Sequence, residues 1–163
     1  MSILRPKRKD RLLNFHIKTN FLTVFLLSAL FLTGCMISLR LNLPGLISYV
    51  LLWCLSYFIL FAGACKNCVY YGKKCPIPLE GSCVNYFFKQ GEGTFGYAAL
   101  FWATIAYVLR ICIPVYLIFS DKLIAPGAIY FSILSVFWVI HLRFTGCPNC
   151  INYQCPLNPE QEN

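Results

Sequence analysis

Four apolar stretches, each about as long as a membrane-spanning helix, dominate this chain of 163 residues. They cover residues 21–39, 46–64, 97–119 and 123–140. A helix needs about 20 residues to cross the hydrocarbon core of a bilayer, because each residue advances it by about 1.5 Å. The stretch at 97–119 contains one arginine, and the other three contain no charged residue. The sequence therefore predicts an all-α integral membrane protein with four transmembrane helices.

The overall composition agrees with this fold class. Charged residues make up only 12% of the chain and hydrophobic residues 58%, whereas a soluble domain has about a quarter of its residues charged. The first stretch follows the basic segment RPKRKDR and is therefore also a candidate for a cleaved secretory signal. It is longer than the apolar core of about 7–15 residues that such signals use. We therefore expect it to remain as the first helix.

The basic residues predict the orientation of the helices. Eleven of the fourteen lysines and arginines precede the first stretch, separate the second from the third, or follow the fourth. These eleven are Arg5, Lys7, Arg8, Lys9, Arg11, Lys18, Lys66, Lys73, Lys74, Lys89 and Arg143. Because basic residues in short loops remain in the cytoplasm, we expect a multi-pass protein of the cell membrane with both termini cytoplasmic. The net charge of +8 is then mainly a topology signal, and nucleic-acid binding is not needed to explain it.

The chain matches itself when it is shifted by 82 residues. RLNLPGLI at 40–47 aligns with KLIAPGAI at 122–129, and a Cys-x-Asn-Cys pattern at 65–68 aligns with one at 147–150. A match of this extent at one offset indicates two tandem helical hairpins, each followed by a cytoplasmic cysteine motif. Both copies then have the same orientation and are related by a pseudo-two-fold axis along the membrane normal. This symmetry brings the two motifs together on one face of the bundle.

The repeat divides the chain into five parts. They are a basic cytoplasmic segment (1–20), a first repeat (21–83), a cytoplasmic linker (84–96), a second repeat (97–156) and a polar tail (157–163). Within each repeat, we expect the Pro-Gly pair to form the tight turn between the two helices, with the proline in the first turn of the second helix.

Seven of the ten cysteines belong to the cysteine-rich segments that follow the hairpins. We name CKNCVYYGKKCP (65–76) the first cysteine motif and CPNCINYQCP (147–156) the second. The candidate metal ligands are Cys65, Cys68, Cys75, Cys83, Cys147, Cys150 and Cys155. Because the cytoplasm keeps thiols reduced, paired Cys-x2-Cys spacings there indicate metal binding or redox catalysis rather than structural disulfides. The other three cysteines lie inside apolar stretches and are expected to be apolar fillers.

Three hypotheses account for these seven cysteines. An iron–sulfur centre is preferred, because thiolates are its usual ligands and a Cys-Pro pair ends both motifs, as it ends the bacterial ferredoxin run. The spacings between the cysteines differ from those of a ferredoxin. His141 is a candidate for a further ligand of the cluster. A structural zinc site is the second hypothesis, with Cys65, Cys68, Cys147 and Cys150 as a tetrahedral set. The third is thiol–disulfide chemistry, since the architecture resembles that of the four-helix, quinone-linked disulfide-forming enzymes.

Arg110 is the one charged residue inside an apolar stretch, near the middle of the bilayer. A charge at that depth costs at least about 2.5–3.5 kcal/mol, and all six acidic residues lie outside the four stretches. Arg110 is therefore expected to contact carbonyls and hydroxyls inside the bundle, or else a quinone, an anionic lipid or substrate, or a carboxylate of another subunit.

These features together predict a redox subunit rather than an enzyme with its own substrate pocket. The expected function is electron transfer or redox sensing by a cytoplasmic iron–sulfur centre, in contact with the lipid bilayer and with another membrane or cytoplasmic redox subunit. A zinc-stabilised membrane scaffold or assembly protein and a quinone-linked thiol oxidoreductase are the alternatives.

Overall fold

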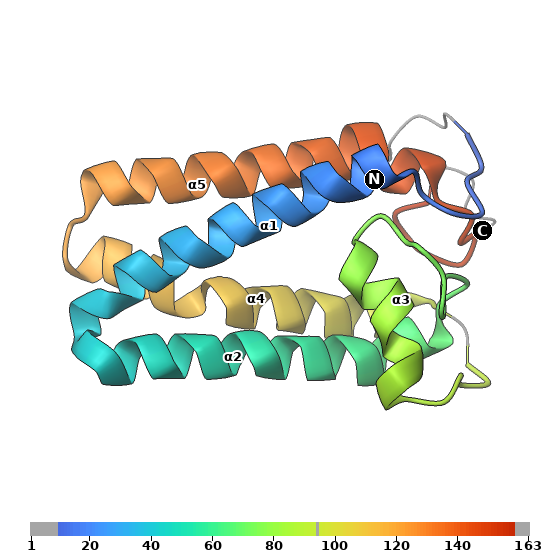
Figure 1. The fold of residues 1–163 in the computed structure, drawn as a ribbon, viewed down its shortest axis with the longest axis horizontal. Helices are drawn as coiled ribbons and strands as arrows, with labels where there is room; N and C mark the ends of the chain where they lie inside the picture. The colour runs from blue at the N-terminus through green and yellow to red at the C-terminus, as the bar shows by residue number, and fades with distance from the viewer. Residues whose placement is uncertain (1–9, 94, 159–163) are drawn as a thin grey trace.

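Figure 1 shows a computed structural model of the chain, which describes residues 10–93 and 95–158. Helices are its only regular secondary structure over these residues. The α-helices are α1 (Ile17–Ser38), α2 (Asn42–Gly63), α3 (Pro78–Phe87), α4 (Tyr97–Ser120) and α5 (Ile124–Val139). Each predicted apolar stretch forms most of one of the four long helices, so the all-helical prediction is confirmed. Arg5, Lys7, Arg8, Lys9 and the end of the polar tail lie outside the described residues.

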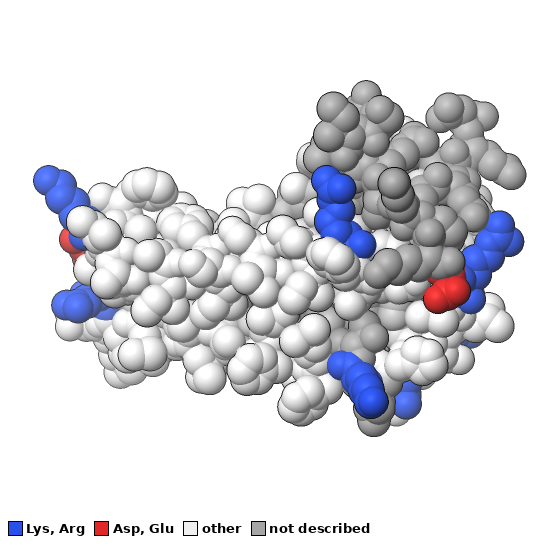
Figure 2. All heavy atoms as spheres, turned by 90° about the horizontal axis from the view of Figure 1, so that it is seen from above, with Lys and Arg blue, Asp and Glu red and all other residues white. Residues whose placement is uncertain are grey.

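Three helical segments of the described chain are long and apolar enough to cross a membrane: Phe21–Asn67, Tyr97–Ser120 and Ile124–Asn149. The first segment contains both α1 and α2, because the short 3-10 turn Leu39–Leu41 joins them. In Figure 1, α1 and α2 nevertheless run in opposite directions. The face seen in Figure 2 carries its lysines and arginines at the two ends of the molecule, with an uncharged band between them. This distribution suits a membrane-embedded protein.

Corresponding helix ends are 82 positions apart in the chain, which is the offset of the sequence match. α1 ends at Ser38 and α4 at Ser120, while α2 begins at Asn42 and α5 at Ile124, so each pair differs by 82 positions. The 3-10 turns that open the two cysteine motifs, Cys65–Asn67 and Cys147–Asn149, differ by the same number. The largest helix–helix interfaces are α2 with α4 and α1 with α5. These two interfaces correspond to each other if α1 is equivalent to α4 and α2 to α5.

The turns between paired helices differ from the prediction. Pro44 and Gly45 lie inside the first turn of α2, and Pro126 and Gly127 lie inside that of α5, so neither pair forms the turn itself. The chain reverses instead at residues with positive φ, Asn42 (61°) and Lys122 (52°). Gly127, which follows the second of these prolines, permits a close contact between α5 and α4. A Cβ at this position would lie 2.7 Å from the side chain of Ile118. Small residues at such points allow helices to approach closely.

The short helix α3 was not expected from the sequence. Pro78 lies in its first turn, where a missing N–H is harmless, and Glu80 follows, where a carboxylate is favoured. α3 crosses the predicted boundary between the first repeat and the linker, and it packs against α2 and α1. In Figure 1 it lies at the end of the bundle where both chain termini also lie.

Close packing of α2 against α4 depends on Gly63, because a Cβ there would lie 2.6 Å from Trp102 on α4. We expect Gly63→Ala to lower the free energy of unfolding by about 1–3 kcal/mol, the usual effect of overpacking. Gly96→Ala is the matched control, since nothing lies within 4 Å of a Cβ at that position, and it should change stability by less than about 0.5 kcal/mol. Thermal unfolding of both variants in one detergent measures the difference. Equal melting temperatures would contradict the close contact.

Candidate functional site

Six of the seven predicted cysteine ligands line a single cavity of about 400 Å³. The first cysteine motif contributes Cys65, Cys68 and Cys75, and the second contributes Cys147, Cys150 and Cys155. The two Cys-x2-Cys pairs are positioned by the 3-10 turns that follow α2 and α5. Segments about 80 residues apart in the chain therefore contribute equal numbers of thiols to one site.

Cys83 is the predicted ligand that does not line this cavity. It lies on α3 and packs against the buried cluster that includes Leu60, Cys65 and Val84. Its assignment as a ligand remains a prediction, and the structure offers it as a control for the other six.

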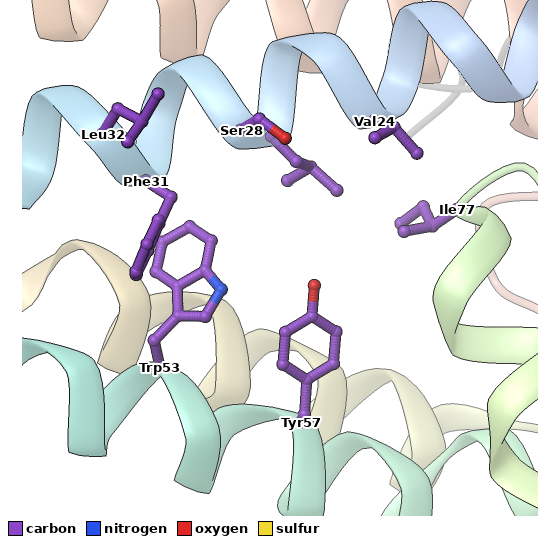
Figure 3. A pocket seen from close by; sticks show the side chains of 8 residues that line it. Val24, Ser28, Phe31, Leu32, Trp53, Tyr57 and Ile77 are labelled. Carbon is purple, nitrogen blue, oxygen red and sulfur yellow. The ribbon is translucent and has the colours of Figure 1, made fainter.

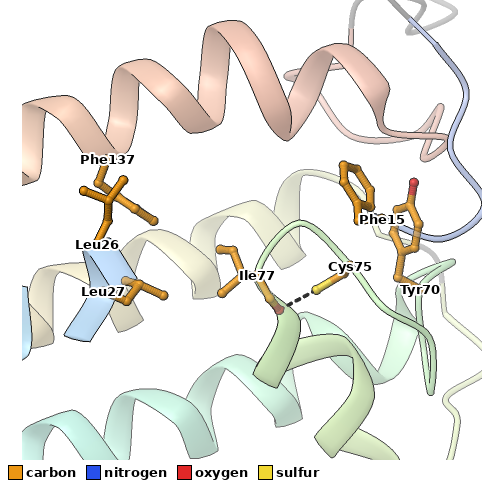
Figure 4. Close-up of a cluster of buried hydrophobic side chains, with 7 residues drawn as sticks. All are labelled: Phe15, Leu26, Leu27, Tyr70, Cys75, Ile77 and Phe137. Carbon is orange, nitrogen blue, oxygen red and sulfur yellow. Dashed lines mark hydrogen bonds between the residues drawn. The ribbon is translucent and has the colours of Figure 1, made fainter. Parts of the chain in front are cut away.

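Tyr70 links the two motifs to each other and to the N-terminal segment. Its hydroxyl donates a hydrogen bond to the Leu12 carbonyl (2.7 Å) and accepts one from the Ile151 amide (3.1 Å). The Leu12 amide in turn donates to the carbonyl of Asn149 (3.0 Å). Figure 4 shows Tyr70 beside Phe15, whose ring is 2% exposed. Part of the segment predicted only as a basic leader therefore contacts both motifs.

Burial is the main influence on the thiols of this cavity. It raises the pKa of Cys68 to about 12, although a backbone hydrogen bond at Tyr70 opposes the rise, and the thiols of Cys150 and Cys155 raise this pKa further. Burial also raises the pKa of Cys155 to about 11. Free thiols with such pKa values stay protonated at neutral pH and are poor nucleophiles. A bound cation reverses this preference, because a thiol that coordinates a metal loses its proton.

Short polar contacts hold individual sulfurs in place. The Cys75 thiol donates a hydrogen bond to the Ile77 carbonyl at 2.7 Å, drawn as a dashed line in Figure 4. The Asn152 amide donates to the Cys150 sulfur at 3.4 Å. Asn149 caps the helix before the second motif, since its side-chain amide donates to the Thr145 carbonyl (2.9 Å). Hydrogen bonds from the backbone to sulfur are among the contacts that tune thiolate-ligated metal centres.

The cysteines surround the cavity without converging on one point. Among the described residues, which include all ten cysteines, no three side chains of His, Cys, Asp or Glu lie close enough together to hold one metal ion. Cys65, Cys68, Cys147 and Cys150 therefore do not form a compact tetrahedral zinc site in this structure. The six thiols around the cavity are the kind of donor that an iron–sulfur cluster uses.

One polar atom in the cavity wall, His141 Nδ1, is buried and makes no hydrogen bond within the described part of the chain. His141 belongs to a π-helical turn, Ile140–Thr145, that continues α5 toward the second motif. Single π-helical turns are frequent at functional sites, and buried polar atoms are rarely unpaired in native proteins. Both features mark this cavity as the candidate site.

Arg110 forms a buried ion pair with Glu80 that was not predicted. Both terminal guanidinium nitrogens lie 3.3 Å from one Glu80 oxygen, and Arg110 Nε donates a hydrogen bond to the Ser56 hydroxyl at 2.7 Å. The guanidinium is fully buried and lies over the ring of Tyr57, 4.2 Å from its centroid. The expectation of a hydroxyl partner is correct. The expectation that only another subunit offers a carboxylate is wrong, because α3 folds back against the bundle.

Glu80 connects this ion pair to the cysteine cavity, which it also lines. Its carboxylate is buried, and burial raises its pKa, while the positive charge of Arg110 opposes the rise. The short helix α3, though not its contact with Arg110, could have been suspected from the PLEG segment, where a proline followed by a glutamate is a helix-start signal. The depth that α3 reaches depends on tertiary packing and carries no sequence signal.

Comparison of the chain with protein-family models, with curated proteins and with solved structures gives no match. The function is therefore argued from the site itself.

The ion pair leads to a stability prediction. Removing one member of a buried pair leaves an uncompensated charge and costs about 3–5 kcal/mol, whereas replacing both with apolar residues is often neutral. We expect Glu80→Met and Arg110→Met each to lower the melting temperature strongly and the double variant to recover most of the loss. Glu92→Met, at an exposed carboxylate, is the matched control and should have little effect. Additive losses in the double variant would contradict a direct pairing of Glu80 with Arg110.

Proposed function

We propose that this protein is a four-span membrane protein that holds an iron–sulfur centre at one end of its helical bundle. The observation that carries the proposal is the placement of six cysteines from two distant motifs around one cavity. A set of donors made mainly of thiols suits iron–sulfur clusters, which take four thiolates each. One cluster bound by four of the six thiols satisfies this requirement, with Cys68 of the first motif and Cys150 of the second among the ligands.

Two observations favour a cluster over the alternatives. The six cysteines around the cavity exceed the four donors that a single zinc ion takes. The raised pKa values of Cys68 and Cys155, caused by their partial burial, disfavour thiol–disulfide exchange, which requires a thiolate. A cluster, when bound, supplies one-electron redox chemistry, and the apolar surroundings of the cavity limit access of water and influence its potential.

The proposed role is electron transfer or redox sensing at the membrane. The matching ends of α1 and α4, and of α2 and α5, support a duplicated hairpin with both copies in the same orientation. The excess of lysine and arginine around the cysteine motifs supports a cytoplasmic position for the cluster and both termini. A partner redox subunit, of the membrane or the cytoplasm, then exchanges electrons with the cluster from that side.

Metal analysis of cysteine variants tests the proposal. Protein purified without oxygen should be brown and contain several irons with an equal amount of acid-labile sulfide. We expect Cys68→Ser and Cys150→Ser each to lose most of this iron, because each motif supplies ligands to one centre. Cys83→Ser and Cys54→Ser are matched controls and should retain it, because neither side chain lines the cavity.

The other outcomes separate the remaining functions. One zinc without sulfide contradicts the redox function and leaves a zinc-stabilised scaffold. Absence of both metals together with a reversibly oxidised Cys-x2-Cys pair leaves a thiol oxidoreductase. If Cys68→Ser loses iron and Cys150→Ser retains it, the two motifs do not share one centre.

Protease access tests the topology. A protease site inserted directly after Met1 should resist cleavage when protease is added to intact cells, since the N-terminal segment is expected in the cytoplasm. The same site should be cleaved in inside-out vesicles. The opposite pattern would move both termini and the cysteine cavity to the outer side.

A further inference from the structure

A second cavity, of about 360 Å³, lies between α1 and α2 in the apolar part of the bundle, as Figure 3 shows. Phe31 of α1 and Trp53 of α2 form an aromatic wall, with their ring centroids 5.1 Å apart. Ser28 and Leu32 lie at its opening and are both exposed, Leu32 by 60%. Because the surrounding surface is apolar, this opening faces the lipid of the membrane rather than water.

Two hydroxyl groups belong to the wall of this otherwise apolar cavity. In Figure 3, the Tyr57 hydroxyl points from α2 across the cavity toward α1, which carries Ser28. The Tyr57 oxygen has the Trp53 side chain as a neighbour, whose indole N–H can only donate, so within the described residues neither hydroxyl has an acceptor for its proton. A polar group without a partner is unfavourable where no water is present. The cavity therefore offers two donors to a ligand that has acceptor atoms.

The cavity adjoins the cysteine site. Ile77 lines both cavities, and its carbonyl accepts the hydrogen bond from Cys75. On the other wall, the Tyr57 ring lies against Arg110, whose partner Glu80 lines the cysteine cavity. A ligand in the α1–α2 cavity is thus separated from the cysteine site by one residue.

We propose that the α1–α2 cavity binds the ring of a membrane quinone. A quinone has a planar ring that can stack on Trp53, two carbonyl oxygens that can accept hydrogen bonds from Ser28 and Tyr57, and an apolar tail that can leave past Leu32. A lipid acyl chain fills the same apolar space but leaves both hydroxyls without acceptors. The role of the quinone as an electron carrier rests on the proposed function, whereas its binding does not.

Fluorescence of the three tryptophans tests the binding, with the purified full-length protein in detergent micelles. A naphthoquinone with a short isoprenoid tail should quench part of the emission in a saturable manner, and Trp53→Phe should abolish the saturable part. Ser28→Leu fills the opening and removes one donor, so it should weaken binding by about tenfold or more. Ser48→Leu, at an exposed serine of α2 away from the cavity, is the matched control and should bind as the native chain does.

The outcomes distinguish this proposal from the proposed function. Quenching that never saturates, or that is equal in Ser28→Leu and Ser48→Leu, means that the quinone only partitions into the micelle and overturns the proposal. Melting temperatures of the two variants verify that both are folded. Iron content is measured on the same samples: iron without quinone binding overturns the quinone site alone, and quinone binding without iron overturns the iron–sulfur centre alone.

Discussion

The buried ion pair between Arg110 and Glu80 joins the membrane bundle to the segment that carries the first cysteine motif. A lone arginine at this depth is unfavourable, and Glu80 supplies the opposite charge from α3, a helix that lies outside the predicted spans. The pair holds α3 against α2 and α4. The residues just before α3, Cys75 and Ile77, are thereby fixed at the wall of the cysteine cavity. The geometry of the site thus depends on a contact within the membrane bundle.

The four long helices could be predicted from the sequence because long apolar helices depend on length and composition, which are local properties. The 82-residue offset of the sequence match recurs between the ends of the helices, since similar segments have similar local structural preferences. The turn residues could not be found in this way. The Pro-Gly pairs are conspicuous in the sequence, but the reversal depends on the positive φ of Asn42 and Lys122, which no residue pattern specifies.

The cysteine site could be predicted only in part, for a similar reason. The spacing of the motifs and the expected symmetry indicated that their cysteines would meet, and six of seven line one cavity. The roles of Glu80, Tyr70 and the N-terminal segment depend on contacts between residues that are distant in the chain, such as the bonds of Tyr70 to Leu12 and Ile151. A single sequence carries no periodicity or spacing that reports such contacts.

Burial, sulfur chemistry and position in the membrane together define the proposed function. Six thiols and a carboxylate held by an arginine surround one cavity, together with a histidine nitrogen that has no partner among the described residues. A second cavity, with the hydroxyls of Ser28 and Tyr57 in its wall, adjoins it. A thiolate-ligated cluster beside a lipid-accessible quinone site is the arrangement that uses both cavities. Ile77 lines both cavities and separates them.

Iron X-ray absorption of the protein purified without oxygen tests the central claim most directly, because it reports the atoms bound to the metal. The account predicts a first shell of sulfur around iron and a second shell of neighbouring irons, the pattern of a cluster held by cysteine thiolates. Absence of iron, with a zinc edge and a shell of sulfur but no neighbouring metal, would contradict it.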